Sequence, residues 1–325
     1  MTDFYVEVAP VLNIQKHPNA DTLSIAEVLG NPVIIRTGEY TDGELAVYVP
    51  VDAIVPSDDP RWAFLSGNWR IKAKKLRGVY SQGILTKADP SWATGQDVRA
   101  ELRIEKHDPG AKLELSMRTN DESQPGWFHL YTDIEGYRKH KTTLVLGEEV
   151  VLTEKIHGAN ARYCFRDGRL WVGSRTRCKL EDPRCMWWAA ARRAGLDEKL
   201  RSAEGITFYG EVYGQVQDLK YGAGQGDVFF RAFDAMDTRT GKYLDHGTFA
   251  ALAETLGIEC VPELYRGPWD VEVCAPLRNG QSTMPGAGHM REGFVVKPMV
   301  ERWEHRLGRV ILKFVGEDYL LRKGA

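Results

Sequence analysis

Short strand-like runs, each closed by turn-forming residues, are the feature that most restricts the fold of this chain. Within the first hundred residues, five such runs follow one another, at 4–14, 23–29, 33–36, 45–51 and 80–86. Proline, glycine, asparagine and aspartate separate the runs, which is typical of turns between strands. Five strands in so short a length predict a small β-barrel.

A polar segment between residues 106 and 126 marks a boundary along the chain. It contains proline and glycine among charged residues, as in His107-Asp108-Pro109-Gly110, and this composition is typical of an interdomain linker. We therefore expect a first domain at 1–110, a linker at 111–126 and a second domain at 127–325.

The second domain combines strands with helices. Asp182-Pro183 is a good start for one helix, because aspartate caps a helix and proline fits its first turn. Another helix is expected between Asp245 and Gly257. With antiparallel strands elsewhere, we predict an α+β fold in which a five-stranded barrel precedes a domain of antiparallel sheets and helices.

Composition limits where the protein acts. At 325 residues with 43% hydrophobic content, the chain can bury two cores, and its net charge of -2 means that any surface for a polyanion is a local patch. Five cysteines without a C-x-x-C pair indicate reduced thiols. No run approaches the roughly 18 apolar residues of a membrane span, and the first residues lack the basic start of a secretion signal. We expect a cytoplasmic monomer without membrane contact or a protein partner.

Lys155 is the lysine whose surroundings suit a nucleophile. The run 148–153 predicts a strand leading into Lys155, and Gly158 ends it, so that the amine stands at the edge of a turn. A second strand is expected to return from Asn160. A lysine amine attacks phosphorus only when deprotonated, and partial burial among cations lowers its pKa toward that state. The alternative is an ordinary edge-strand lysine before a turn glycine.

Further charged residues stand in strand-like runs after Lys155. They are Arg175, Glu211, Glu292, Lys297 and Lys313. Because strands alternate the direction of their side chains, several such strands can bring these groups into one polar pocket. A pocket with lysines, an arginine and two glutamates suits a nucleoside triphosphate and its metal ion. The alternative is a set of ordinary surface ion pairs.

A cluster of cations lies in the first domain, between Trp69 and Tyr80. Such a mixture of cations and aromatic residues is expected of a surface that follows phosphates and stacks on bases or sugars. The cations are Arg70, Lys72, Lys74, Lys75 and Arg77. The alternative is a solvated charged loop.

The order of these motifs resembles that of the covalent nucleotidyltransferases, and most closely that of ATP-dependent RNA ligases of the T4 RNA ligase 2 type. The matching segments are 154–160, Arg175, 210–214, Phe233-Asp234, 292–297 and Lys313. In the first domain, 16–21 and 76–83 resemble the OB domain of the Deinococcus and Naegleria type of RNA ligase. Together these likenesses cover nearly the whole chain. They imply an OB barrel followed by a nucleotidyltransferase domain with an ATP-grasp-like arrangement.

The resemblance implies roles in catalysis. Lys155 would attack the α-phosphorus of ATP, expel pyrophosphate and carry AMP. Lys297 and Lys313 would stabilise the charge that builds on the α-phosphate, and their proximity would keep Lys155 less protonated. Glu211 and Glu292 would hold a hydrated Mg²⁺ or Mn²⁺ ion near that phosphate.

The resemblance also implies a nucleotide pocket. Phe233 would stack on adenine, and Glu154 with its backbone would contact the edge of the base. Arg175 and Asn160 would contact ribose and phosphate, and Ile156 belongs to the same pocket.

His157 and Lys313 depart from parts of the family pattern. His157 stands where DNA ligases and some RNA ligases have aspartate, and we place it with the nucleotide and metal ligands. A lone histidine beside a turn is otherwise most often a residue whose hydrogen bonds are satisfied within the fold. Ile311 and Val315 flank Lys313, where the family often has two lysines. Lys313 would therefore act alone or share its task with Lys297 or Arg322.

The function implied by the resemblance is ATP-dependent sealing of 3′-hydroxyl and 5′-phosphate ends in RNA repair. The expected substrate is a nick in an RNA or RNA/DNA duplex. DNA ligases and capping enzymes, which are the runner-up enzymes, carry an OB domain after the last lysine motif. Only 12 residues follow Lys313 here, so we expect none in that place. The alternative from another class is a noncatalytic protein that binds RNA ends.

Overall fold

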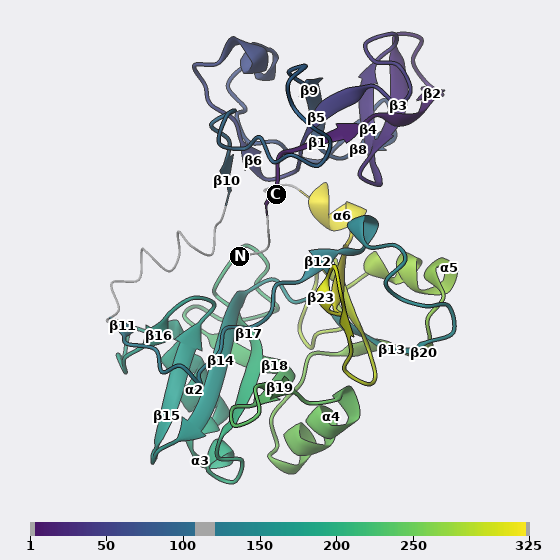
Figure 1. Cartoon of the computed structure of the whole chain (residues 1–325). Coiled ribbons are helices and arrows are strands. Elements are labelled where there is room, and N and C mark those ends of the chain that lie inside the picture. Colours follow the sequence, from purple (N-terminus) through teal and green to yellow (C-terminus); the bar gives the residue numbers. More distant parts are fainter. Residues whose placement is uncertain (1–3, 108–120, 323–325) are drawn as a thin grey trace. The chain divides into compact units, whose positions relative to one another are not determined.

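The computed structural model describes residues 4–107 and 121–322. The chain divides into two compact units, Met1–Pro109 with Leu320–Ala325 and Gly110–Tyr319, and Figure 1 shows their elements. The division falls close to the domain boundary predicted from composition. The first ten residues of the predicted linker at 111–126 lie outside the described residues, and the predicted domain limits stay a prediction.

The first unit consists of short antiparallel strands. One three-stranded sheet has the order β1 (Glu7–Pro10), β5 (Leu45–Val49) and β9 (Ile84–Lys87). A second has the order β2 (Leu12–Lys16), β3 (Leu23–Val28) and β4 (Asn31–Arg36). Two smaller ladders and one 3-10 helix complete the unit: β7 (Lys74–Leu76) with β8 (Val79–Ser81), β6 (Ala53–Ile54) with β10 (Glu105–Lys106), and η1 (Pro60–Leu65).

The sequence predicts a five-stranded barrel, but the described residues of the first unit do not form a closed barrel, and the count of five strands is not confirmed. Their ladders stay in separate sheets, because two of the predicted strands are interrupted. The first one breaks at Val11 into β1 and β2, next to Asn13, whose φ of 54° belongs to the left-handed region and shifts the register. The last one breaks before Gly83 into β8 and β9, where a Cβ atom would overlap the Tyr48 ring.

The second unit contains a seven-stranded sheet in which all pairs are antiparallel. Its strands in order are β11 (Asp121–Glu122), β16 (Cys178–Lys179), β15 (Arg169–Ser174), β14 (Ala159–Arg166), β17 (Ile206–Gly214), β18 (Val228–Asp237) and β19 (Lys242–Tyr243). Helices α2 (Met186–Ala194) and α3 (Leu196–Arg201) pack against this sheet, and α2 begins three residues after Pro183. Helix α4 (His246–Thr255) follows Asp245, where the sequence predicts it.

A five-stranded sheet forms the other half of this unit. Its order is β12 (Glu135–Gly136), β24 (Leu312–Val315), β21 (Gly293–Pro298), β13 (Glu149–Glu154) and β20 (Glu263–Pro268). The pair β12–β24 is parallel and the other pairs are antiparallel. The remaining elements are short: η2 (Tyr137–Lys139), α5 (Val271–Cys274), η3 (Ala275–Arg278), the hairpin of β22 (Trp303–Glu304) and β23 (Gly308–Arg309), and α6 (Glu317–Leu320). The α+β class predicted from the sequence is confirmed.

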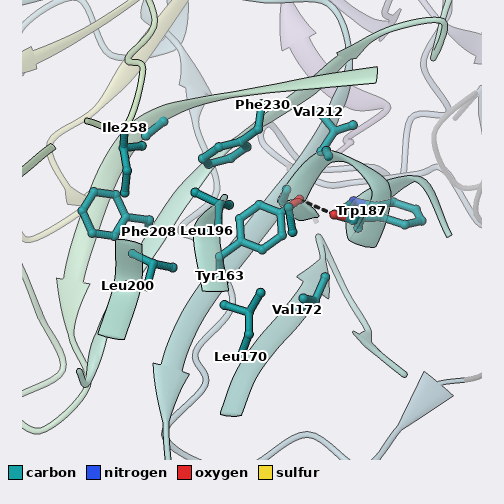
Figure 2. Close-up of a cluster of buried hydrophobic side chains, with 14 of the residues drawn as sticks. Tyr163, Leu170, Val172, Trp187, Leu196, Leu200, Phe208, Val212, Phe230 and Ile258 are labelled. Carbon is teal, nitrogen blue, oxygen red and sulfur yellow. Dashed lines mark hydrogen bonds between the residues drawn. The ribbon is translucent and has the colours of Figure 1, made fainter. Parts of the chain in front are cut away.

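The largest hydrophobic core lies between the seven-stranded sheet and helices α2 and α3. Figure 2 shows Tyr163 and Phe208 from the strands beside Trp187 and Leu196 from the helices. The Tyr163 hydroxyl donates a hydrogen bond to the Trp187 carbonyl oxygen over 2.9 Å, so the buried phenol is satisfied. This core covers one face of the sheet, and smaller clusters with Tyr209 and Met236 and with Cys164 and Cys178 pack on the other face. A separate core beneath the five-stranded sheet uses Phe294, Val296 and Leu312.

Candidate active site

Lys155 stands where the chain passes from one sheet of the second unit to the other. Strand β13 ends at Glu154, and the Lys155 amide donates to the Gly293 carbonyl over 3.0 Å. Strand β14 of the other sheet begins at Ala159. Gly158 makes this passage possible, because a Cβ atom there would overlap the Val212 backbone oxygen. The strand-to-turn position predicted for the lysine is therefore the observed one.

The amine of Lys155 faces carboxylates. Its Nζ donates to Glu292 Oε1 over 2.6 Å, and its side chain is 28% exposed. Burial alone lowers the pKa of Lys155, but the charges of Glu292 and Glu211 outweigh burial and raise the pKa above its ordinary value. The predicted lowering by neighbouring lysines is therefore wrong for this state of the protein. The charge of Arg175 acts in the opposite direction, and its effect on the pKa of Lys155 is smaller than that of the carboxylates.

The two glutamates differ in their protonation. Burial opposes ionisation of Glu292, but Lys155 and His157 lower its pKa to about 2. Glu211 is also buried, and burial together with the charge of Glu292 raises its pKa to about 7, although Lys155 acts in the other direction. When both carboxyl groups are ionised, their two negative charges exceed the single positive charge of Lys155.

This surplus fits a divalent cation. Among residues 4–107 and 121–322, the buried Oε2 atom of Glu292 has no hydrogen-bond partner, and it lies 3.6 Å from His157 Nδ1. Among residues 4–107 and 121–322, no group of three His, Cys, Asp or Glu side chains is placed to hold a metal ion directly. Two carboxylates with an orphaned oxygen suit an ion that keeps most of its water, as Mg²⁺ does.

His157 does not offer a ring nitrogen to a metal ion in this structure. Its Nε2 lies 2.6 Å from Asp218 Oδ1, and its Nδ1 lies 2.9 Å from the hydroxyl of Tyr319 in α6. Its backbone amide donates to the Tyr221 hydroxyl over 2.7 Å. The prediction of His157 as a metal ligand is therefore not supported by the geometry, because both nitrogens already have partners.

Glu154 uses its carboxylate inside the fold. The side chain accepts hydrogen bonds from the Ser282 hydroxyl, the Thr283 amide and the Thr283 hydroxyl, at 2.5, 2.7 and 2.6 Å. The residue is 2% exposed, and its amide donates to Pro262. Glu154 therefore anchors the loop that carries Ser282 beside the lysine. Its neighbour Ile156 is buried at 4% exposure.

The predicted ribose, phosphate and adenine contacts lie on the two sheets around Lys155. Asn160 is opposite Glu211 in the β14–β17 pair, so their side chains share a face. The buried Asn160 Oδ1 has no hydrogen-bond partner within the described parts of the chain. Arg175 makes an ion pair with Asp133. The ring of Phe233 is tilted against that of Tyr131, with centroids 4.9 Å apart, and is half-buried.

The predicted phosphate-binding lysines have different surroundings. Lys313 is opposite Val295 in the β21–β24 pair, and Lys297 lies two residues further along β21, so the three side chains share one face. Lys313 is half-buried, whereas Lys297 is 4% exposed. The Nζ of Lys297 is 2.9 Å from Asp234 Oδ1, which places this lysine in a buried ionic cluster.

That cluster joins the two sheets. Asp234 in β18 also accepts a hydrogen bond from Arg309 over 2.5 Å and from the Tyr131 hydroxyl over 2.8 Å. Glu301 bonds to Arg309 over 2.5 Å and lies 3.4 Å from Lys297. Two cations and two carboxylates balance each other beneath Phe233.

Several residues of the site carry no signal in the sequence. Asp218, Tyr221, Ser282, Thr283 and Tyr319 sit in loops or a short helix outside the motifs. Asp234 could have been found from its position beside Phe233 in the matching motif. The others become recognisable only through their contacts.

The cations predicted to bind nucleic acid lie in the first unit. Arg70 is held by Asp52, with Nε and Nη2 at 3.0 and 2.6 Å from Oδ1. The other four, Lys72, Lys74, Lys75 and Arg77, are exposed, and within residues 4–107 and 121–322 they make no ion pair.

Lys155 and its two carboxylates between two sheets agree with the covalent nucleotidyltransferase class that the motifs resemble. A family model described as RNA ligase matches residues 148–315, about half of the chain. The protein therefore belongs to the RNA ligase family. An OB-fold domain model matches residues 5–88, which assigns the short strands of the first unit to the OB fold.

Solved structures of Naegleria gruberi RNA ligase share the fold. A variant with ATP and Mn matches with 23% identity and a TM-score of 0.82, covering 97% of each chain. An apo variant has 24% identity and a TM-score of 0.82 over 98% of each chain, and the complex with PPi has 23% identity, the same TM-score and the same coverage.

A shorter similarity links the chain to the phenylalanine–tRNA ligase beta subunit of Neisseria meningitidis serogroup A. It is 38% identical over 85 residues, which is 26% of this chain. The matched part spans only 10% of that subunit. None of the helices in the described parts of the chain has the length and hydropathy needed to cross a membrane.

Proposed function

We propose that this protein is an ATP-dependent RNA ligase that joins 3′-hydroxyl and 5′-phosphate ends through a lysyl-AMP intermediate on Lys155. The observation that carries this proposal is the 2.6 Å contact between Lys155 Nζ and Glu292, at the junction of the two sheets and inside the region matched by the RNA ligase family. The Naegleria gruberi RNA ligase structures with ATP, AMP, Mn and PPi support the choice of nucleotide and metal.

The reaction has three steps. The neutral amine of Lys155 bonds to the α-phosphorus of ATP and releases a proton to solvent, and the bond to pyrophosphate breaks. A 5′-phosphate oxygen of the nucleic acid then takes AMP from the lysine, which regains its free amine. Finally the 3′-hydroxyl attacks the adenylylated phosphate, loses its proton, joins the strands and releases AMP.

Glu211 and Glu292 are the residues that would hold Mg²⁺ or Mn²⁺, which supplies positive charge for the oxygens of the α-phosphate. Without a bound metal ion, the charges of Glu292 and Glu211 raise the pKa of Lys155 and so favour its protonated amine. If a metal ion offsets the negative charge of Glu211 and Glu292, the burial of Lys155 favours its neutral amine. Metal binding by the two carboxylates would therefore lower the pKa of Lys155 and prepare its amine for attack.

Around the nucleotide, the remaining roles follow from position. Phe233 and Ile156 would contact adenine, and Glu154 would keep the Ser282 loop in place beside it. Lys313, half-buried on the face shared with Val295, is the better placed of the two lysines to meet phosphate. Lys297 would act chiefly through Asp234, because that carboxylate already holds its amine.

Ribose and phosphate contacts would come from the seven-stranded sheet. Asn160 offers a buried oxygen without a partner on the face of Glu211. Arg175 would have to leave or share Asp133 to reach a phosphate.

The test of the first step uses ATP labelled in its α-phosphate with magnesium or manganese, followed by denaturing electrophoresis. We expect an acid-labile label on the wild-type chain and none on Lys155→Ala. Lys242→Ala, which removes an exposed lysine of the same unit, should keep the label. No label from ATP would support the noncatalytic RNA-end-binding protein, and label from GTP would move the protein to the capping enzymes.

The nucleic-acid substrate is proposed to be a nick in an RNA or RNA/DNA duplex, with ribose on the 3′-hydroxyl side. Nicked duplexes with ribose or deoxyribose at each terminal position test this choice. Equal sealing of all-DNA nicks would contradict it and favour a DNA ligase. The five free cysteines fit a reducing cytoplasm, and we propose a cytoplasmic monomer active in RNA repair.

Lys72, Lys74, Lys75 and Arg77 are proposed to bind the RNA backbone. Changing Lys75 to alanine should weaken RNA binding and lower its salt dependence, while labelling of Lys155 by ATP stays. Arg70→Ala should weaken RNA binding less, because Asp52 already neutralises Arg70. An equal loss in both variants would show that Asp52 does not shield Arg70.

A further inference from the structure

The basic hairpin of the first unit, formed by β7 and β8, has a turn that needs outside support. Arg77 and Gly78 form the turn, with φ of 45° and 87°. Positive φ at both central residues is typical of a tight two-residue hairpin turn, but a non-glycine residue such as Arg77 adopts it only where its surroundings hold it. The turn places Arg77 at the end of the hairpin, beyond Lys74 and Lys75.

A loop far away in the sequence provides that support. His17 Nε2 lies 3.1 Å from the Leu76 carbonyl oxygen, and Asn19 Nδ2 donates to the Arg77 carbonyl oxygen over 2.9 Å. The Asn19 amide group lies so close to Gly78 that a Cβ atom there would be 3.7 Å from Asn19 Nδ2. The carbonyl oxygens of Leu76 and Arg77 therefore each have a side-chain partner from the β2–β3 loop.

The geometry also fixes the state of the His17 ring. The backbone amide of Asn19 donates to His17 Nδ1 over 3.0 Å, so Nδ1 is an acceptor. Nε2 then carries the proton and donates to the Leu76 carbonyl, which can only accept. His17 is 1% exposed, so this neutral ring is a built part of the fold and not a surface contact.

The hairpin held in this way presents uncompensated charge. Several other cations of the first unit have carboxylate partners, as in Lys87 with Glu44 and Arg103 with Asp58. The four exposed cations of the hairpin region, Lys72, Lys74, Lys75 and Arg77, have none among the described residues. Such a patch on a chain of net charge -2 suits the phosphodiester backbone of RNA.

We propose that His17 and Asn19 are positioning residues for RNA binding, because they hold the β7–β8 turn and so fix the arrangement in which the hairpin presents its cations, Lys75 and Arg77 above all, to the RNA backbone. This inference deepens the proposed function and rests on the RNA-binding role given there to the first unit. Neither residue touches the RNA itself.

The test compares Asn19→Ala with wild type in binding of a nicked RNA duplex, at a stated salt concentration. We expect the dissociation constant to rise about tenfold, since one hydrogen bond that orders several phosphate contacts is lost. Labelling of Lys155 by ATP and the thermal midpoint should stay near wild type. Asn68→Ala is the matched control, because its exposed side chain makes no hydrogen bond within residues 4–107 and 121–322.

Two further measurements separate positioning from a general loss of structure. Amide hydrogen exchange at 74–81 should quicken in Asn19→Ala while exchange in β1 and β5 does not change. In a chain that already carries alanine at Lys74, Lys75 and Arg77, Asn19→Ala should have no further effect on RNA affinity. His17→Gln, which can still reach the Leu76 carbonyl, should lose less affinity than His17→Ala.

Unchanged RNA affinity in Asn19→Ala would overturn the inference, and so would a further loss in the triple-alanine background. RNA binding that is absent in wild type would overturn it as well. Failure of the proposed function looks different: Lys155 would take no label from ATP, whatever the RNA affinity.

Discussion

Removing the carboxylate of Asp234 should destabilise the second unit severely. Asp234 is fully buried and accepts hydrogen bonds from Lys297, Arg309 and Tyr131 at 2.9, 2.5 and 2.8 Å. In Asp234→Ala, the two buried cations share only Glu301. Breaking a buried ion pair in this way costs about 3–5 kcal/mol. For a unit of this size that corresponds to a fall in Tm of roughly 6–20 °C.

The contribution of Asp234 to the stability of the fold depends on pH. Burial opposes ionisation of Asp234, but Arg309 and Lys297 hold its pKa below the usual range. A carboxyl with a lowered pKa contributes stability above its unfolded pKa of about 3.9, and that contribution is lost as the pH falls through the folded pKa. The difference between wild type and Asp234→Ala should therefore be full at pH 7 and shrink below about pH 4.

The assay is thermal unfolding of the whole chain, followed by circular dichroism at several pH values. Asp197→Ala is the control, because the pair of Asp197 with Arg201 is half-exposed on α3 and should contribute no more than about 0.5 kcal/mol. If Asp234→Ala melts within about 2 °C of Asp197→Ala at pH 7, the ionic cluster does not stabilise the fold as argued here.

Two more predictions concern the nucleophile. Glu292→Gln should lower the pKa of Lys155, because the Glu292 carboxylate is the strongest of the groups that raise this pKa. The pH dependence of Lys155 acylation in the absence of nucleotide measures the pKa. A profile that does not change from wild type to Glu292→Gln contradicts the prediction. Gly158→Ala should reduce labelling of Lys155 by ATP at least about tenfold, because a shift that relieves the overlap with Val212 moves the lysine and misplaced reacting groups lose rate steeply. Gly126→Ala, where a Cβ atom would meet open space, should keep wild-type labelling.

The strand segments and the helices of the second unit could be predicted from the sequence, because alternating hydrophobic residues and turn formers act over a few positions. The run before Lys155 is β13, and the run after Gly158 is β14. The arrangement of the strands in the first unit could not be predicted in this way. The break at Val11 lies beside Asn13 with its left-handed backbone, and the break at Gly83 lies where the chain approaches the Tyr48 ring, which is a contact in space.

The candidate active site, too, could be predicted from the sequence only in part. The order of motifs around Lys155, Glu211 and Glu292 is a property of the sequence, since each residue sits in a recognisable local pattern. The effect of these groups on the pKa values of one another is not a property of the sequence. The raised pKa of Lys155 is opposite to the predicted lowering by neighbouring cations. We expected the side chain of Lys297 to lie beside the amine of Lys155, but Lys297 forms an ion pair with Asp234 instead.

The sequence by itself determined the strand segments, the helices, the family and the position of Lys155 at the end of a strand, because these depend on residues close together along the chain. The tertiary structure alone decided which partner each charged group meets. His17 with the Arg77 turn, His157 with Tyr319 and Asp234 with Arg309 are separated by 59 to 162 residues. Electrostatic and hydrogen-bond energies depend on distances in space, and separation along the sequence does not fix those distances.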